Sequence, residues 1–469
     1  MPNILEQQPL YTSATGQIPV GSDVIFAVSN MTIVAQQLKV KFVAEVHISS
    51  GTPPNLNTTN SLVGTFKTTP NNKGVGIFNF SNIVENYVKA DNMAANKSEY
   101  KGTETDADNR HPIHLIDKFS LNKNAIRYLA IQFKIEYLGA TDCNGSQNDN
   151  VVREACSEEV NTNTFTLMNG YVKDTDILTK QADNFGYDLT RFIGQPTTYT
   201  NASVLSNAPT KQYAAKEDYG TFAFLADDNS ITSVEIDIYI PPSTLYSVSI
   251  PRTEANGAFN TWSANADRNL VYFGCYPANL RQNATFNTHI DTMSHYSVYV
   301  KSGTGYMQGR TVYIQCPDLK GYTPIRLCWL NQWGVWDYYT FNKKSIKSIS
   351  TKGSTYNQLA GTWNESTYRL DSYKGGKKSF RVNATEKIKI NTDFVNEDHN
   401  TMFEELMNST EVYILDGFQT DAANSALNQY VTPVRIESKN FTSKTVANDK
   451  LIQYTFEVEK TKTLRTQSV

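Results

Sequence analysis

The clearest hydrophobic pattern in the chain lies between residues 325 and 341, where two short apolar runs flank a polar turn. Alternate positions of the runs are apolar: Ile325, Leu327 and Trp329 in the first, and Val335, Tyr339 and Phe341 in the second. Residues 331–334 (Asn-Gln-Trp-Gly) fit a four-residue hairpin loop, with Gly334 free to take a positive φ. Three of the five tryptophans fall in this segment. We therefore expect a buried β-hairpin that acts as a packing centre.

Alternating apolar positions also predict an N-terminal β-sandwich domain over residues 1–140, of immunoglobulin-like type. Its expected strands contain Val24, Phe26 and Val28, then Phe42, Ala44, Val46 and Ile48, then residues 76–80, and last Leu129, Ile131, Phe133, Ile135 and Tyr137. The other face of the second strand carries Lys39, Lys41, Glu45 and His47, which predicts that this face meets solvent. Ser81 is a candidate N-cap for a short helix carrying Ile83, Val84, Tyr87 and Val88.

Residues 141–163 are polar and have no hydrophobic period, so they are interpreted as a linker or an exposed insertion. Cys143 and Cys156 lie in this stretch and are close enough in sequence to be bridged. Five cysteines are an odd number and no Cys-x-x-Cys occurs, so free or incidental thiols are the favoured interpretation.

A central β domain is expected over residues 164–350. Its strands are predicted at 234–240, 269–275, 295–301 and 310–315, followed by the hairpin at 325–341.

The last part, residues 351–469, is expected to form a β-rich domain with one short helix. Residues 396–407 have helical spacing, with Asn396 as N-cap and with Met402, Phe403 and Leu406 as the apolar stripe. Strands are predicted at 412–415, 432–437 and 451–459, and Ile452, Tyr454, Phe456 and Val458 form the inner face of the last one. The basic segment 460–465 is interpreted as a frayed end or as a docking arm for a neighbouring subunit.

Composition supports the same fold class: mainly β, with several immunoglobulin-like or β-sandwich domains and a few short helices. The chain has 27 Tyr and 22 Phe, and these residue types suit pleated, half-buried surfaces. The net charge of −3 argues against sequence-independent binding of nucleic acid. Because the start has no leader pattern and no apolar run approaches the ~20 residues of a spanning helix, we expect a soluble protein made in a cytoplasm, without membrane insertion.

Few residues are candidates for chemistry. His111 and His114 surround a proline in a loop and are weak candidates for a metal site, and residues 227–229 (Asp-Asp-Asn) resemble only part of a calcium loop. Structural or exposed roles are expected for His289 and His295, which flank the start of a strand. Asp337 stands between Trp336 and Tyr338, where a carboxylate can bind a sugar or have a raised pKa, although a solvent-facing strand position or a pair with Arg326 is favoured. With no nucleotide, zinc or hydrolase motif, no catalytic, cofactor-binding or metal-binding residue is predicted, and the chain is not expected to be an enzyme.

Three groups of motifs resemble a family of tailed-bacteriophage virion proteins of the crAss-like and related phages of Bacteroidetes hosts. The matching stretches are residues 18–26, 41–46 and 76–88 in the N-terminal part, residues 327–331 and 336–341 in the hairpin, and residues 404–409, 412–415, 430–434 and 451–459 near the C-terminus. They are packing motifs, they occur in order, and they span most of the chain.

The resemblance implies a virion structural protein without enzymatic activity. The implied function is a multi-copy tail component (hub, ring or baseplate), a homo-oligomer that contacts other tail proteins and is assembled in the host cytoplasm. Two alternatives stay open: an adhesin module of the tail that binds a receptor or a host surface glycan, and a structural protein of the head or of the head–tail connector region. A polysaccharide-degrading enzyme is the least favoured alternative, since paired carboxylates meet only in the fold.

Overall fold

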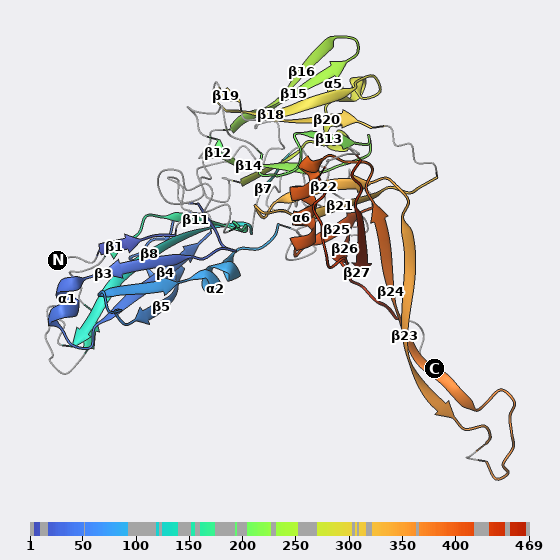
Figure 1. Cartoon of the computed structure of the whole chain (residues 1–469), viewed down its shortest axis with the longest axis horizontal. Coiled ribbons are helices and arrows are strands. Elements are labelled where there is room, and N and C mark those ends of the chain that lie inside the picture. The colour runs from blue at the N-terminus through green and yellow to red at the C-terminus, as the bar shows by residue number, and fades with distance from the viewer. Residues whose placement is uncertain are drawn as a thin grey trace. The chain divides into compact units, whose positions relative to one another are not determined.

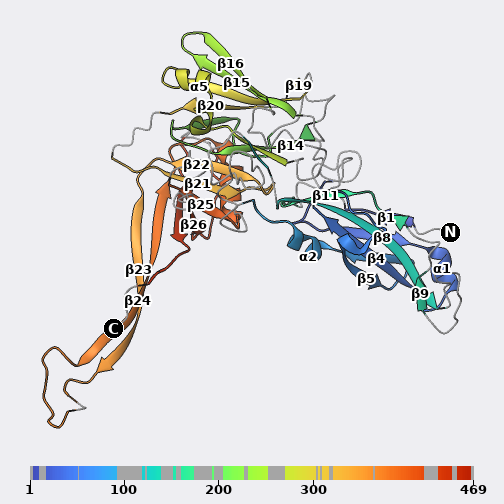
Figure 2. The same ribbon diagram turned by 180° about the vertical axis from the view of Figure 1, so that it is seen from behind.

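The computed structural model describes residues 4–9, 17–50, 52–91, 119–121, 124–138, 152–154, 160–173, 193–194, 204–226, 231–251, 270–302, 305–306, 309–315, 321–362, 365–416, 431–445 and 451–465. The fold is mainly β with a few short helices, as the composition predicts (Figures 1 and 2). The chain divides into two compact units. The first comprises residues 1–316, 330–337 and 418–427, and the second comprises residues 317–329, 338–417 and 428–469.

The first unit begins with a β-sandwich. One sheet has the order β2-β11-β8-β4-β5, with β9 and β10 also paired to β8, and the other has the order β1-β3-β6. The strands are β1 (Ile4–Gln7), β2 (Gln17–Pro19), β3 (Ile25–Ser29), β4 (Lys41–Ser49), β5 (Leu62–Thr68), β6 (Val75–Asn79), β8 (Ile126–Leu138), β9 (Val152–Glu154), β10 (Val160–Asn161) and β11 (Phe165–Met168). Two short helices, α1 (Met31–Gln36) and α2 (Ser81–Val84), connect strands, together with the 3₁₀ turns η1 (Thr59–Ser61) and η2 (Glu85–Tyr87).

Phenylalanine side chains join the two layers of this sandwich. The ring of Phe26 on β3 lies 6.0 Å from that of Phe133 on β8 and 5.7 Å from that of Phe165 on β11. Phe78 on β6 also contacts Phe133, at 5.5 Å. These residues are almost fully buried, so the alternation in the sequence correctly identifies the core.

Three expectations for this region are corrected. His47 is 2% exposed and its Nδ1 lies 3.1 Å from the Ser61 hydroxyl, so this face of β4 is covered at His47, whereas Lys41 is exposed as predicted. Ser81 lies inside α2, and its hydroxyl accepts the Val24 N–H. The N-terminal sheet does not end near residue 140, because β9, β10 and β11 pair with β8. The described parts of 141–163 are therefore strands and their flanks; Cys143 and Cys156 lie outside the described residues.

A second pair of sheets completes the first unit. A four-stranded sheet has the order β12-β14-β17-β7, and a larger one has the order β13-β20-β18-β15-β16, with β19 paired to β18. Their strands are β7 (Phe119–Leu121), β12 (Ile193–Gly194), β13 (Lys211–Ala214), β14 (Thr221–Ala226), β15 (Ile231–Ile240), β16 (Thr244–Pro251), β17 (Leu270–Gly274), β18 (His295–Ser302), β19 (Gly305–Tyr306) and β20 (Arg310–Ile314), with helices α4 (Pro277–Leu280) and α5 (Ala284–His289). Val234, Ile236 and Ile238 are buried, as their alternation predicts.

The second unit is built on an eight-stranded sheet with the order β22-β21-β25-β26-β27-β24-β23, and β28 also pairs with β24. Leu330 at the end of β21 and Trp336 and Asp337 at the start of β22 are counted with the first unit. Its strands are β21 (Ile325–Leu330), β22 (Trp336–Phe341), β23 (Ile346–Gln358), β24 (Gly376–Asn391), β25 (Val412–Leu415), β26 (Val431–Ile436), β27 (Thr455–Lys460) and β28 (Leu464–Arg465). Helix α6 (Asn400–Asn408), preceded by the 3₁₀ turn η11 (Glu397–His399), covers one face. The ring of Phe403 on α6 lies 5.1 to 6.3 Å from the rings of Tyr339, Phe341, Tyr454 and Phe456.

The hairpin at 325–341 forms as predicted, with Gly334 at φ +70°. Its place in the fold differs from the expected boundary at 350, since β21 and β22 belong to the sheet of the C-terminal strands. The helix stripe and the inner face of the last strand are confirmed, whereas the Asn396 side chain makes no capping hydrogen bond. The segment 460–465 is not frayed, because Leu464 and Arg465 pair with Ala384 and Asn383.

Candidate functional site

Asp337 is the residue that the sequence singles out most strongly, and it lies in a buried polar cluster of the first unit. Its carboxylate accepts hydrogen bonds from the Ser206 hydroxyl at 2.6 Å and from the Asn331 amide nitrogen at 3.1 Å. The Arg310 guanidinium donates to the Ser206 carbonyl oxygen at 2.9 Å, which places a cation beside the cluster. We call Ser206, Arg310, Asn331 and Asp337 the buried clasp.

Burial raises the pKa of Asp337 to about 6, against the opposing effects of its two hydrogen bonds and of Arg310. The favoured prediction for this residue was wrong: Asp337 is 5% exposed, so it does not face solvent, and its hydrogen-bond partners are Ser206 and Asn331 rather than Arg326. The raised pKa that the aromatic neighbours suggested is confirmed in direction.

The clasp fixes a loop rather than presenting a reactive group. The Asn331 side chain donates to the Leu205 carbonyl and accepts the Trp333 N–H at 2.9 Å, which closes the turn from inside. On the other side of the turn, the Gln332 carbonyl accepts the Tyr171 N–H at 2.9 Å. Each oxygen of the carboxylate accepts a hydrogen bond from the protein itself, so the clasp is a structural element of the fold.

The remaining sequence candidates are structural or lie outside the described residues. His289 stacks on Tyr246 with ring centroids 4.0 Å apart, and His295 stacks between Tyr239 and Tyr313. His111, His114 and residues 227–229 lie outside the described residues. Cys275 and Cys328 are buried. Among the described residues, no three His, Cys, Asp or Glu side chains gather in a way that would hold a metal ion.

Sequence reasoning missed a pair of ordered carboxylates on the solvent-facing side of the six-stranded sheet. Glu235 and Asp237 alternate with the buried Val234, Ile236 and Ile238 on β15. Asp237 accepts hydrogen bonds from the Ser247 hydroxyl at 2.6 Å and from the Tyr299 hydroxyl at 2.7 Å. Glu235 accepts from the hydroxyls of Ser233 and Ser249, at 2.7 and 2.8 Å.

The hydroxyl groups that bind these two carboxylates come from β15 itself and from its two neighbours, β16 and β18. Among the described residues, no Lys or Arg forms an ion pair with either carboxylate. Burial and the hydrogen bond to Asp237 raise the pKa of Tyr299, so this phenol stays a donor. We call Glu235, Asp237 and their hydroxyl partners the acidic face.

A row of rings borders the acidic face along the next level of the sheet. Tyr213, Tyr313, His295 and Tyr239 are cross-strand neighbours on β13, β20, β18 and β15, and Leu245 on β16 ends the row. Adjacent centroids lie 4.5 to 5.5 Å apart with small interplanar angles. Because the rings cover one another's faces, the row offers edges and phenol hydroxyls to solvent, and Tyr213 is 60% exposed.

The second unit carries a long β-hairpin, β23–β24, that we call the arm and define as residues 346–386. Near its base β24 pairs with β27 at residues 387–391 and with β28 at 383–384; farther out, β23 is its only partner among the described strands. Figure 1 shows these two orange strands running past the rest of their sheet. Nearly every residue of β23 is exposed, so this part of the hairpin lacks a core of its own.

The end of the arm is organised by its own hydrogen bonds. The Asp371 N–H donates to the Ala360 carbonyl at 3.1 Å and the Thr362 N–H donates to the Arg369 carbonyl at 3.0 Å. Large apolar side chains nevertheless point outward. Seven of the nineteen exposed large hydrophobic residues among the described ones lie on the arm: Ile346, Ile349, Leu359, Tyr368, Leu370, Tyr373 and Phe380.

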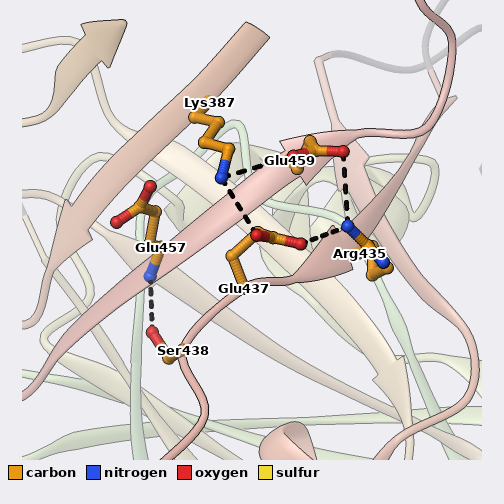
Figure 3. A network of polar contacts seen from close by, with 6 residues as sticks. All are labelled: Lys387, Arg435, Glu437, Ser438, Glu457 and Glu459. Carbon is orange, nitrogen blue, oxygen red and sulfur yellow. Dashed lines mark hydrogen bonds and ion pairs between the residues drawn. The ribbon is translucent and has the colours of Figure 1, made fainter. Parts of the chain in front are cut away.

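A closed ring of ion pairs anchors the base of the arm (Figure 3). Lys387 on β24 lies 3.0 Å from Glu437 and 3.5 Å from Glu459, and Arg435 contacts the same two carboxylates. These residues come from three adjacent strands and are partly exposed, so the ring links β24 to β26 and β27 on the polar face of the sheet.

Comparison with known proteins adds no identity. Neither a scan against protein-family models nor a search of curated proteins finds a match to this chain. None of the described helices is long and apolar enough to cross a membrane.

Proposed function

We propose that this protein is a structural component of a bacteriophage virion, acting as a multi-copy part of the tail (a hub, ring or baseplate protein) through protein–protein contacts. Its partners would be further copies of itself and other tail proteins, and it would be incorporated into the particle in the host cytoplasm. The observation that carries the proposal is the arm, a paired hairpin that has no core of its own along β23 and exposes large apolar side chains.

The physical argument is that such a hairpin gains most of its stability from a partner. An isolated two-stranded hairpin is marginally stable in water, and contiguous exposed apolar side chains mark interaction surfaces. Leu359, Leu370 and Tyr373 are 68%, 75% and 72% exposed, although the end of the arm is ordered by local bonds. A preorganised backbone loses little entropy on binding, which favours contact with another protein.

The motifs that resemble those of tailed-phage virion proteins support the same function, because they are packing motifs without chemistry. The buried clasp agrees with a structural function, since each oxygen of the Asp337 carboxylate accepts a hydrogen bond from the protein itself.

The test is to purify the particles of the phage that encodes this chain and to identify their proteins by mass spectrometry. We expect many copies of the polypeptide per particle, and cryo-EM of the same particles should place it in the tail. Particles without the polypeptide would contradict the proposal, and density in the head or in the connector region would favour that alternative position.

A second function is favoured by one observation. The row of phenol hydroxyls beside two ordered carboxylates on the six-stranded sheet offers hydrogen bonds of the kind that sugar hydroxyls accept and donate. An adhesin module of the tail would bind host polysaccharide through this surface, and Tyr213→Ala would weaken that binding. A glycan array without signal for the purified chain would exclude this function.

A further inference from the structure

We propose that the arm of one copy docks on the acidic face of a second copy of this chain, so that copies join head to tail. This inference rests on the proposed function for the existence of many copies, and it names the two surfaces that meet.

Charge is the first argument. The arm holds seven basic residues (Lys347, Lys352, Arg369, Lys374, Lys377, Lys378 and Arg381) and three acidic ones (Glu365, Asp371 and Glu386), a net charge of +4. Since the whole chain carries −3, the remainder carries −7. A basic projection on an acidic body is complementary to another copy of the same body, and such fields raise the rate of correct encounter.

The unpaired charges on the two surfaces are the second argument. Lys352 and Lys377 are exposed and form no ion pair within the described part of the chain. Among the described residues, Glu235 and Asp237 have hydroxyl partners only, and they are held at positions two residues apart on β15. When the two surfaces meet, the lysines of the arm can form ion pairs with the carboxylates of the acidic face.

The edge of the arm shows how the contact is made. A free edge strand can recruit another strand, but β23 carries Lys347 and Lys352 and has a register shift between Ser354 and Thr355. Lysines and bulges are the features that prevent edge-to-edge pairing. Side chains of the arm's faces and end, Leu370 and Tyr373 among them, therefore make the contact, and the row of rings beside the acidic face receives them.

Arm and acidic face are different surfaces, so the interface is heterologous. A heterologous interface leaves one free arm and one free face at each step, and it closes into a ring when the rotation between copies allows it.

The test uses the full chain and two double variants. The arm variant is Leu370→Ser with Tyr373→Ser, and the face variant is Glu235→Lys with Asp237→Lys. The matched control reverses two exposed lysines of the first unit that form no ion pair within the described residues, Lys73→Glu with Lys89→Glu. Sedimentation velocity over a range of concentrations measures self-association, and thermal melting shows that each variant is folded.

We expect the wild type and the control to self-associate alike, and each of the other two variants to do so at least tenfold more weakly. Mixing the arm variant with the face variant should give a 1:1 dimer that grows no further, because one intact arm and one intact face remain in the pair.

Three results would overturn the inference: a wild type that stays monomeric throughout, a face variant that associates like the wild type, or a mixture that stays monomeric. A fourth is an arm variant that self-associates like the wild type, and binding of duplex DNA by the wild type would then assign the basic arm to nucleic acid. If the particles contain the chain but the purified chain does not self-associate, this inference fails and the proposed function stands. If the chain self-associates but is absent from the particles, the proposed function fails and this inference stands.

Discussion

The carboxylate of Asp337 accepts a hydrogen bond from the hydroxyl of Ser206, 131 residues earlier in the chain, with 2.6 Å between the two oxygens. The same Ser206 hydroxyl accepts the Ala208 N–H at 3.0 Å, so one side chain closes a local turn and binds the distant hairpin loop. A contact of this sequence separation costs loop-closure entropy during folding. Because the two residues are so far apart in sequence, this hydrogen bond forms only when the chain between them has folded.

The stability of the protein should depend on pH through Asp337. Its pKa is raised from 3.8 to about 6, so the folded state binds the proton more tightly than the unfolded state. The stabilisation is therefore complete below pH ~4 and is lost as the pH rises through ~6, a change on the order of 3 kcal/mol. Urea unfolding from pH 4 to 8, compared with Asp337→Asn, measures it.

The substitution Asp337→Asn should remove this pH dependence. With its amide oxygen toward the Asn331 amide and its amide nitrogen toward the Ser206 hydroxyl, the neutral side chain imitates the protonated carboxyl, so the free energy of unfolding of the variant should not change through this position between pH 4 and 8. The difference in free energy of unfolding between variant and wild type should therefore change as the pH rises through ~6. A difference that does not change between pH 4 and 8 would contradict the raised pKa.

Gly334→Ala should prevent the hairpin loop from packing against the backbone of Asn169. Gly334 has φ +70°, and a Cβ there would lie 1.5 Å from the Asn169 carbonyl oxygen, which is backbone and cannot move away freely. We expect a loss of roughly 3 kcal/mol or more in the free energy of unfolding. Gly321→Ala is the matched control: its φ is +82° with nothing within 4 Å, so only about 1 kcal/mol of backbone strain is expected. Equal melting temperatures for the two variants would argue against the close approach.

Phe403→Ala should destabilise the second unit by about 3–5 kcal/mol, because it empties a ring position among Tyr339, Phe341 and Phe456. Thr401→Ala, on the exposed side of the same helix, should change the free energy of unfolding by less than about 0.5 kcal/mol. Chemical denaturation of the two variants checks the pair. A small effect of Phe403→Ala would mean that α6 is not the cover of this sheet.

Glu437→Gln should lower the melting temperature slightly, and the effect should disappear in about 1 M salt, because the ring of ion pairs at the base of the arm is exposed to solvent. The hydrogen bond from Lys387 lowers the pKa of Glu437, so its contribution is present above the unfolded pKa and is lost as the pH falls, opposite to Asp337. Melting curves at low and high salt test this. An effect that persists in high salt would indicate a packing role for this side chain.

Local patterns predicted the strands and the core well, because period-two alternation reports directly which side chains face a layer. The hairpin at 325–341, the stripe of Met402, Phe403 and Leu406, and the inner face of the last strand are found as expected. Boundaries between domains were predicted less well. The sequence of β11 fits equally well the last strand of one domain or the first strand of the next. Only its pairing with β8 shows that it belongs to the N-terminal sheet.

The polar clusters could not be predicted, because they depend on which strands become neighbours. Nothing near Asp337 in sequence indicates Ser206 or Arg310, and Glu235 and Asp237 look like ordinary solvent-facing positions until Ser247 and Tyr299 are placed beside them. The exposure of the arm has a sequence signal, since β23 is rich in Ser, Thr and Lys with few apolar residues, but its length as a paired hairpin follows only from the register with β24.

The pairing of β7 with β17 has a consequence for how the chain is made. Leu121 lies opposite Val271, so this strand leaves the ribosome 150 residues before its partner. At roughly 5–20 residues per second the wait is on the order of ten seconds. Translation speed and chaperone access over that interval thus become determinants of yield, and a chain truncated near residue 140 would separate β7 from the sheet that it completes.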